Sequence, residues 1–595
     1  MTLRPRSSET RAVRFFVNRA AWVLCASAMA VAGHGRVRAE DRPAGSGGRL
    51  SSAELELRMF EKRGIRANPY RAGRSMTMSR HGIVASEHYL ASLAGLDMLR
   101  SGGSAMDAAV AVAATLNVVE PMMTGAGGDV FILYYEAATG KVHALNGSGH
   151  APRKLTMDYF RDHDRHSIND HSWEAVTVPG AVDAWLTAHE KFGRLPLEKV
   201  FAPAIHHAEE GYPISEIVGM AWNAYGRALQ RDRWARETYL VDGKPPKIGT
   251  VFKNPRLAKS LRQIAAGGRD AFYRGPIAKE IVRYAQETGG FLTMEDFAAH
   301  HSDWVEPITT NYRGYDVYQC PPNGQGIGVL LMLNILEGFD LPKMKFDSPE
   351  YLHLLIEAKK LAYADLHRYV ADPRKSRVPV KELLSKAYAA RRRKLIDLQK
   401  AAPDVEPGLP VGSDTTYFTV IDAEGNAVSF INSLYSAFGS GIVGGSTGIM
   451  LQNRGAGFTL EEGHPNQYAP GKRPYHTIIP GMVLKDGKLY LSYGLMGGAM
   501  QPQGHVQFLL AHLDHGLTIQ EAMDVPRWRH MSGLEVRLEH GTPRATMAAL
   551  RALGHEVRPA NLSDFGSSQA ILVDPKTGTY FGASDPRRDG MALGY

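Results

Sequence analysis

The sequence predicts an α+β protein in which a mainly helical first part precedes a strand-forming, glycine-rich second part. Apolar residues recur at helical spacing from Ala85 onward. After residue 414 the period changes to that of a β-hairpin, and glycine-rich segments follow at Phe438–Gly448 and Gly494–Gly498. A hydrophobic content of 44% and a charged content of 22% are typical of a globular protein with an ordinary core.

The first 39 residues have the order of a secretory signal: arginines, the apolar run Ala20–Gly33, and a small-residue site ending at Ala39. Seven arginines and one glutamate give this segment +6 of the total charge of +8. The remainder is nearly neutral, which argues against a nucleic-acid-binding surface. We therefore expect export to the periplasm or outside the cell, with no membrane span after signal removal. The alternatives are a membrane anchor, for which the run is short of about 20 residues, and lipidation at Cys25, which lacks small residues before it.

Signal removal leaves Cys320 as the one remaining cysteine, which excludes an internal disulfide. Residues 40–80 are rich in Arg, Gly and Ser, have little periodicity, and are interpreted as a leader.

Helices are predicted at Ala85–Arg100 and, after the break Ser101-Gly102-Gly103, at Ala105–Val119, with Ser104 as its N-cap. The glycine cluster Thr124–Asp129 precedes a predicted strand, Val130–Tyr135. Phosphate-binding loops have the reverse order, strand then glycines then helix, so close backbone packing is the better interpretation.

Helices and short turns alternate over residues 172–400, with one helix predicted at Pro349–Val370. A basic helix at 389–394 is interpreted as a solvated face. The Pro- and Gly-containing stretch Ala401–Gly412 reads as an exposed, cleavable connector. A hairpin follows, with strands Thr415–Asp422 and Ala427–Ser433. The histidines show no metal-ligand spacing, and no metal or cofactor is expected.

Thr415 opens this hairpin strand directly after the connector and the small-residue junction Gly412-Ser413-Asp414. A threonine hydroxyl is a poor nucleophile that needs an adjacent base. If the chain is cut before Thr415, the freed α-amine supplies that base within the same residue. On its own the pattern is weak, because Thr-Thr at the start of a strand is common.

From about Gly82 to the C-terminus the chain resembles the γ-glutamyltransferase (γ-glutamyl transpeptidase) family, with the family's sequence blocks in the family's order. The first half carries Gly102–Ala111, Val178-Pro179-Gly180, Phe272–Gly275, Tyr312–Tyr315 and Glu357–Asp365. The second half carries Thr415-Thr416, Asp422–Val428, Phe438–Gly441, Lys472-Arg473-Pro474, Gly497-Gly498 and Asp585-Pro586-Arg587.

The resemblance implies the four-layer αββα sandwich of N-terminal-nucleophile hydrolases. It also implies cleavage between Asp414 and Thr415, which gives a large subunit (81–414) and a small subunit (415–595) from one precursor. Thr415 matches the nucleophile, and Ser433 matches a hydroxyl residue bonded to it. Gly497 and Gly498 match the pair whose N–H groups face the oxyanion.

The substrate clamp departs from the transpeptidase pattern. Ser148 stands where the resemblance places an arginine for the α-carboxylate, and His476-Thr477 replaces a serine pair. On the side that holds the α-amine, Tyr435 replaces an asparagine and Gly457 an aspartate. His150, Arg153 or Arg454 could compensate. The candidate substrate-binding residues are Ser148, Tyr435, Asn453, Arg454, His476 and Thr477.

The segment Thr459–Gly471 is shorter than the lid of full-length transpeptidases, which favours water over an amine as acyl acceptor. These features are similar to an amidohydrolase and acylase-like branch that includes cephalosporin acylase-like and oxamate amidohydrolase-like proteins. We expect a self-processing enzyme for a small γ-glutamyl (glutathione-type) amide. The alternatives are a non-glutamyl amidase or acylase, and an uncut, catalytically silent binding protein.

Overall fold

The computed structural model describes residues 73–403 and 414–595. The predicted signal with its cleavage site at Ala39, most of the leader and most of the connector lie outside these ranges. Within them, no helix combines the length and the apolar character needed to cross a bilayer.

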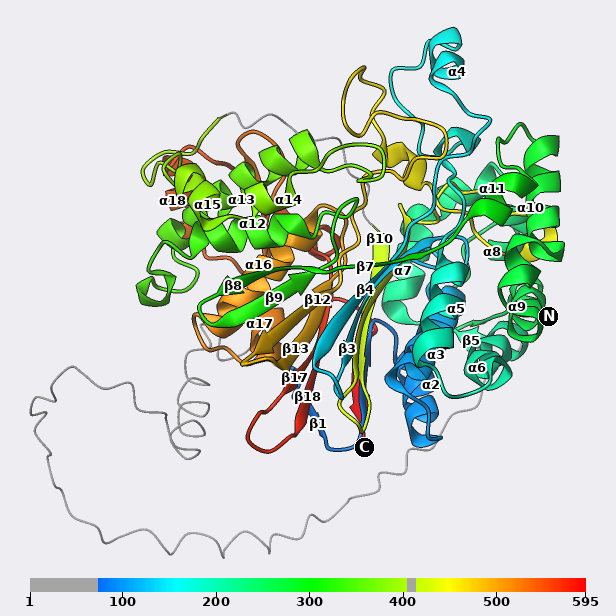
Figure 1. Cartoon of the computed structure of the whole chain (residues 1–595), viewed down its shortest axis with the longest axis horizontal. Coiled ribbons are helices and arrows are strands. Elements are labelled where there is room, and N and C mark those ends of the chain that lie inside the picture. Colours follow the sequence, from blue (N-terminus) through cyan, green and yellow to red (C-terminus); the bar gives the residue numbers. More distant parts are fainter. Residues whose placement is uncertain (1–72, 404–413) are drawn as a thin grey trace, which may run out of the picture. The chain divides into compact units, whose positions relative to one another are not determined.

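Two seven-stranded sheets stack face to face between two layers of helices (Figure 1). Neighbouring strands in both sheets are antiparallel. The first sheet has the order β1 (Thr77–Ser79), β18 (Tyr580–Ser584), β17 (Ser568–Val573), β13 (Lys488–Leu495), β12 (Gly481–Lys485), β9 (Tyr315–Gln319), β8 (Ile308–Tyr312). The second has the order β19 (Met591–Gly594), β2 (Ile83–Ser86), β10 (Asp414–Ile421), β11 (Ala427–Tyr435), β3 (Asp129–Glu136), β4 (Lys141–Gly147), β7 (Asp303–Val305).

Helices from the first half of the chain cover the outer face of the second sheet (Figure 1). They are α2 (Tyr89–Arg100), α3 (Ala105–Val119), α5 (Ala181–Phe192), α6 (Leu197–Glu210) and α9 (Pro255–Tyr273), with the neighbouring α7 (Glu216–Tyr225), α8 (Arg233–Tyr239), α10 (Pro276–Glu287) and α11 (Met294–Ala299).

The outer face of the first sheet is covered by α12 (Ile327–Leu336), α13 (Pro349–Tyr369) and α16 (Met500–Leu513), with α14 (Val380–Leu383), α15 (Lys386–Arg393), α17 (Ile519–Asp524) and α18 (Arg544–Ala552) nearby. A small sheet of β14 (Trp528–His530), β15 (Glu535–Glu539) and β16 (Glu556–Ala560) lies on the same side, where Trp528, Val536, Leu538 and Val557 join its core. Shorter elements are α4 (Met157–Asp162) and the pair β5 (Tyr212–Pro213) and β6 (Val251–Phe252).

Side-chain alternation along the central strands explains the layering. On β3, Val130 and Ile132 pack toward α3 and α5, while Phe131 and Leu133 pack into the core between the sheets. Successive side chains of a strand point to opposite faces, so a strand that is apolar at every position must be covered on both sides. These layers confirm the predicted α+β four-layer αββα sandwich.

Most predicted elements are present. α3 has the predicted bounds, and Ser104 caps it in a capping box with Asp107. The helix predicted at Ala85–Arg100 begins too early, because Ile83–Ser86 is strand β2 and the helix starts at Tyr89. An apolar run of this length fits a strand as well as a helix. Here it forms a strand, because it pairs with β10 and β19.

The basic helix is also only partly a solvated face. Arg392 and Arg393 of α15 donate to the carbonyls of Leu361 and Ile335, on α13 and α12.

The predicted hairpin is β10 and β11, and it lies in the middle of the second sheet. β10 pairs with β2 on one side and β11 pairs with β3 on the other. Residues on both sides of the expected cleavage site therefore share one sheet.

Candidate active site

Thr415 lies at an irregularity in the β10–β11 ladder. Asp414 pairs with Tyr435 and Thr416 with Asn432, so Thr415 on β10 faces two residues of β11, Ser433 and Leu434, and β11 carries the extra residue of a bulge. The Thr415 side chain is buried, with only 1% exposed. The bulge therefore lies on β11 opposite Thr415, whose hydroxyl donates to Ser433 on that strand.

The Ser433 hydroxyl is the centre of the site. Its Oγ accepts a hydrogen bond from Thr415 Oγ1 at 3.1 Å, from Arg454 Nη2 at 3.0 Å and from the Tyr435 backbone N–H at 2.8 Å. The donors around Ser433 fix its oxygen in place, and Ser433 in turn orients the Thr415 hydroxyl. The structure thus brings together the predicted nucleophile and its predicted partner.

Arg454 is completely buried beside this pair. Its Nη1 donates to Thr477 Oγ1 at 2.8 Å, and the guanidinium lies 4.3 Å from the centre of the Tyr435 ring. Burial lowers the pKa of Arg454 to about 10, which still leaves it charged at neutral pH. Among the side chains that the structure describes, no carboxylate forms an ion pair with it, and its Nε–H has no acceptor.

Tyr435 reaches the guanidinium through an unusual backbone conformation, with φ at +83°. Such a value is rare for a bulky side chain and needs support from the surroundings. Asn453 supplies it, because its N–H donates to Leu434 O at 3.1 Å and its Oδ1 accepts from Ser436 N at 3.0 Å. Asn453 thus positions Tyr435, a role that differs from the predicted contact with substrate.

The predicted oxyanion glycines form the turn between β13 and α16. Gly497 and Gly498 have φ values of +124° and +56°, which favour glycine. Their carbonyls accept hydrogen bonds, that of Gly498 from Gln325 Nε2 at 2.9 Å. Neither N–H donates to another described residue, so both remain available for an oxyanion.

Glu87 connects the nucleophile strand to this turn. Its buried Oε1 accepts from the Tyr417 N–H at 3.3 Å and from Ser567 Oγ at 2.9 Å. The Ser567 carbonyl accepts from the N–H of Met496, the residue before Gly497, at 2.9 Å. Sequence reasoning missed Glu87, because a single acidic residue after a strand has no pattern that marks it as buried.

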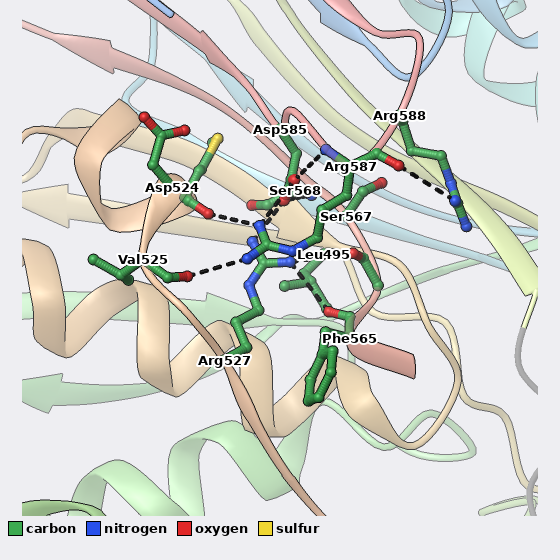
Figure 2. A network of polar contacts seen from close by, with 12 residues as sticks. Leu495, Asp524, Val525, Arg527, Phe565, Ser567, Ser568, Asp585, Arg587 and Arg588 are labelled. Carbon is green, nitrogen blue, oxygen red and sulfur yellow. Dashed lines mark hydrogen bonds and ion pairs between the residues drawn. The ribbon is translucent and has the colours of Figure 1, made fainter. Parts of the chain in front are cut away.

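A second network fixes the loop behind Gly497 (Figure 2). Arg527 donates from Nη1 to the carbonyls of Phe565 and Gly566 at 3.1 and 3.2 Å, and from Nη2 to Asp585 Oδ2 at 2.6 Å. A Cβ built on Gly497 would lie 3.2 Å from Gly566 Cα, so the loop and the turn are in close contact. The Asp585-Pro586-Arg587 block of the sequence therefore has a positioning role that its pattern alone did not reveal.

Two predicted substrate-binding residues belong to a neighbouring buried network. His476 Nε2 lies 3.1 Å from Asp129 Oδ2, and both side chains are fully buried. Burial lowers the pKa of His476 to about 4, so a neutral imidazole donates to the Asp129 carboxylate. Ser148 Oγ accepts from Asn323 Nδ2 at 3.1 Å, and Gly149 N donates to Asp129 Oδ1 at 2.8 Å.

The structure distinguishes the three residues that could compensate for the missing clamp arginine. Arg153 has about half of its side chain exposed and forms an ion pair with Asp296 at 3.6 Å. His150 stacks near His300, and burial lowers its pKa to about 4, so it carries no charge at neutral pH. Arg454 is the candidate that contacts the partner of the nucleophile.

The short lid segment Thr459–Gly471 is fixed to the rim of the site. Asn466 Nδ2 donates to Gly457 O at 2.7 Å, and its Oδ1 accepts from Tyr475 N at 2.9 Å. Lys472 Nζ donates to Pro465 O and Gln467 O. These bonds hold the segment as a compact loop, at the place where full-length transpeptidases have a longer lid.

Outside the site, the fold brings together the buried side chains of His353, Glu357 and His555, a set that the sequence spacing did not suggest. These residue types can hold a divalent metal ion. Here His353 Nδ1 and His555 Nε2 are in hydrogen-bond contact at 2.8 Å, and Lys360 Nζ lies 2.8 Å from Glu357 Oε1. The lysine already supplies the positive charge that a metal ion would bring to Glu357.

Comparisons with known proteins agree with the site. A sequence model described as gamma-glutamyltranspeptidase matches residues 91–595. The glutathione hydrolase-like YwrD proenzyme of Bacillus subtilis is 41% identical, over 86% of this chain and 98% of that protein. The glutathione hydrolase proenzyme of Escherichia coli is 37% identical, over 87% of this chain and 92% of that protein.

Among solved structures, a cephalosporin acylase from Bacillus halodurans superposes with a TM-score of 0.84 at 41% identity. The match covers 89% of this chain and 98% of the acylase. Residues 91–595, which the sequence model matches, include the hairpin of Thr415, the turn at Gly497 and Gly498, and the C-terminal Asp585-Pro586-Arg587 block. The chain is therefore an enzyme of the gamma-glutamyltranspeptidase family.

Proposed function

We propose that this enzyme is a self-processing amidohydrolase that cuts its own chain between Asp414 and Thr415 and then uses Thr415 to hydrolyse a small amide. The observation that carries the proposal is the hydrogen bond from Thr415 Oγ1 to Ser433 Oγ. The N–H groups of Gly497 and Gly498, which have no acceptors in the described chain, support it. The relatives named above are proenzymes, which supports self-cleavage here.

In the processing reaction, the Thr415 hydroxyl oxygen attacks the carbonyl carbon of Asp414. The C–N bond to Thr415 breaks, an ester to the hydroxyl forms, and the nitrogen takes up a proton. Water then hydrolyses the ester, which releases the Asp414 carboxylate and leaves Thr415 with a free α-amine.

In the catalytic cycle, the Thr415 hydroxyl passes its proton to its own amine and attacks the substrate carbonyl. The N–H groups of Gly497 and Gly498 stabilise the oxyanion of the tetrahedral intermediate. The leaving amine takes the proton and departs, and the acyl group remains as an ester on Thr415. The α-amine then activates a water molecule, which releases the acid.

Water is the preferred acyl acceptor. The lid segment Thr459–Gly471 is short and held in place at Gly457 and Tyr475. A short, fixed lid gives water access to the acyl-enzyme, so hydrolysis competes well with transfer to an amine.

Two acyl groups are in question. A γ-glutamyl amide of the glutathione type is the first candidate on the names of the relatives. The residues present favour the second candidate, a non-glutamyl acyl amide, since Ser148, Tyr435 and Gly457 replace the arginine, asparagine and aspartate of the glutamyl clamp. Loss of charge-assisted contacts of this kind costs about 1.5–3 kcal/mol each.

The N-terminal signal pattern supports processing of this enzyme outside the cytoplasm, in the periplasm or beyond. Expression of the full chain, fractionation, and N-terminal sequencing of the exported protein test this, and a retained Met1 would contradict it.

Thr415→Ala tests the main proposal. The purified wild-type protein should give two bands on a denaturing gel, the smaller beginning at Thr415, and Thr415→Ala should give one uncut, inactive chain. Thr415→Ser should restore processing and part of the activity, because it keeps the hydroxyl. A single uncut wild-type chain, or a new N-terminus at another residue, would contradict this mechanism. An uncut chain would favour the alternative of a catalytically silent binding protein.

A further inference from the structure

We propose that Arg454 anchors a free carboxylate on the acyl part of the substrate, so that the enzyme selects acyl groups with a carboxylate and without a neighbouring ammonium. Monoamides of small dicarboxylic acids have this chemistry. The inference rests on the proposed amidohydrolase function and names the substrate class of the same site.

The first argument is the unmatched charge of Arg454. Two other buried arginines, for comparison, have carboxylate partners: Arg473 with Asp303 at 2.7 Å, and Arg527 with Asp585 at 2.6 Å. Arg454 is fully buried, yet its direct partners in the described chain are two neutral hydroxyls and an aromatic ring, and Asp129 acts on its charge without forming an ion pair with it. A buried cation without a direct ion pair is unfavourable, and a carboxylate from the substrate would supply one.

The second argument is distance. The hydrogen bonds of 3.1 and 3.0 Å that meet at Ser433 Oγ place Arg454 Nη2 within about 6 Å of Thr415 Oγ1. A reacting carbonyl carbon lies about 3–3.5 Å from its nucleophile, and a guanidinium–carboxylate hydrogen bond spans about 2.7–2.9 Å. A carboxylate attached directly to the attacked carbonyl can reach Arg454, and chains with up to three methylenes reach it by bending.

The third argument is discrimination against an α-amine. In the transpeptidases that the sequence resembles, an asparagine and an aspartate hold the amine, and Tyr435 and Gly457 stand at those positions. Arg454 lies against Tyr435 and three residues before Gly457. A guanidinium on this side of the pocket repels an ammonium group. The position that binds the α-amine in the transpeptidases therefore disfavours an amine in this enzyme.

The chain's own scissile bond obeys the same rule. In self-processing the acyl residue is Asp414, whose side chain ends in a carboxylate and whose nitrogen is an amide without charge. The first acyl group that Thr415 handles is therefore an anion without an ammonium.

A matched set of p-nitroanilides tests the proposal. Glutaryl and γ-L-glutamyl groups have the same length and terminal carboxylate and differ by the α-ammonium, and a butyryl group lacks both charges. For processed wild-type enzyme we expect kcat/KM for the glutaryl substrate to exceed that for the γ-glutamyl substrate by about tenfold or more. The reason is repulsion between the α-ammonium of the γ-glutamyl group and the Arg454 guanidinium. We expect butyryl to be slower than glutaryl by about a hundredfold, because the charge-assisted contact is lost.

Arg454→Gln should reduce glutaryl turnover by about a hundredfold and bring the glutaryl to γ-glutamyl ratio close to one. Arg454→Lys, which keeps the charge, should preserve the direction of the preference. The control is Arg473→Gln, which removes another buried guanidinium whose charge is already balanced by Asp303, and it should leave the ratio unchanged. The ratio is measured within one preparation, so it does not depend on the processed fraction.

Failure of the two proposals is distinguishable. An uncut chain on the gel, or activity that survives Thr415→Ala, contradicts the amidohydrolase mechanism. A fully processed enzyme that prefers γ-glutamyl, that cleaves neither carboxylate-bearing substrate, or that keeps its ratio in Arg454→Gln overturns the role of Arg454 alone.

Discussion

Glu87 accepts a hydrogen bond from the backbone N–H of Tyr417 at 3.3 Å, two residues beyond the nucleophile. Ala85 pairs with Thr419 where β2 runs beside β10, and Glu87 continues along the same edge toward Thr415. The same carboxyl oxygen accepts from Ser567, whose carbonyl holds Met496. One side chain thus sets the position of the nucleophile strand relative to the oxyanion turn.

Replacing Glu87 should shift the strand that carries Thr415 relative to the turn at Gly497 and Gly498. Burial raises the pKa of Glu87 well above its ordinary value, so a neutral side chain with an acceptor oxygen can replace it. We expect Glu87→Ala to lower kcat by about tenfold or more with little change in KM, because a small displacement of reacting groups is costly. Glu87→Gln should keep most of the activity. Steady-state kinetics of both variants check this, and equal losses in the two would contradict it.

Ser433 is expected to act in both processing and turnover. Ser433→Ala removes the acceptor for the Thr415 hydroxyl and one partner of Arg454, and we expect processing to slow and kcat to fall by about a hundredfold. Ser433→Thr keeps a hydroxyl and should recover both. Gel-based processing rates and the kcat of the cleaved fraction measure the effect. If Ser433→Ala processes and turns over at the wild-type rate, the hydrogen bond is not functional.

Arg527, drawn with its network in Figure 2, holds the loop at Phe565 and Gly566, which is in close contact with the turn at Gly497. Arg527→Gln should release the carbonyls of Phe565 and Gly566 and remove one of the two arginines paired with the buried Asp585, leaving Arg587 as the other. The loss of one member of a buried ion pair typically costs about 3–5 kcal/mol of stability. The temperature of thermal unfolding should therefore be lower in this variant, and kcat should fall by a larger factor than the affinity for substrate. A variant with wild-type kcat would show that the network is purely structural.

Glu120 gives a pH dependence of stability. Burial raises its pKa from the ordinary 4.5 to about 7, so the unfolded state loses this proton at lower pH than the folded state. The contribution of Glu120 to the free energy of unfolding therefore falls as pH rises from about 4.5 to 7, by about 3 kcal/mol in total.

Glu120→Gln removes the titration and should be more stable than wild type at pH 8, with little difference at pH 4.5. Denaturant unfolding at several pH values measures this. Parallel curves for the two proteins would assign the pH dependence to other groups.

The sequence was sufficient for the α+β fold class, the nucleophile hairpin and the bounds of α3, because each has a strong local pattern. The resemblance implied the pairing of Thr415 with Ser433, and the two residues lie on adjacent strands of one hairpin. The glycine turn at Gly497 could be identified by resemblance, since only small residues fit there.

Residues that act across the fold could not be found in this way. Glu87 and Ser567 are separated by 480 positions, and Arg527 and Asp585 by 58, so no local period relates them. The sequence offered three candidates for a replacement clamp residue, and burial and contacts in the folded chain distinguish Arg454 from Arg153 and His150. The strand β2 was misassigned because its pairing partners lie more than 300 residues away.

The central position of β10 and β11 has a consequence for the processed enzyme. Strands from after the cut lie between β2 and β3 from before it, and in the other sheet β18, β17, β13 and β12 lie between β1 and β9 from before it. Scission of one peptide bond therefore yields two polypeptides that are interleaved and cannot diffuse apart on dilution. They should melt in a single cooperative transition, and once unfolded they would have to find each other again, which makes heat inactivation of the mature enzyme depend on protein concentration.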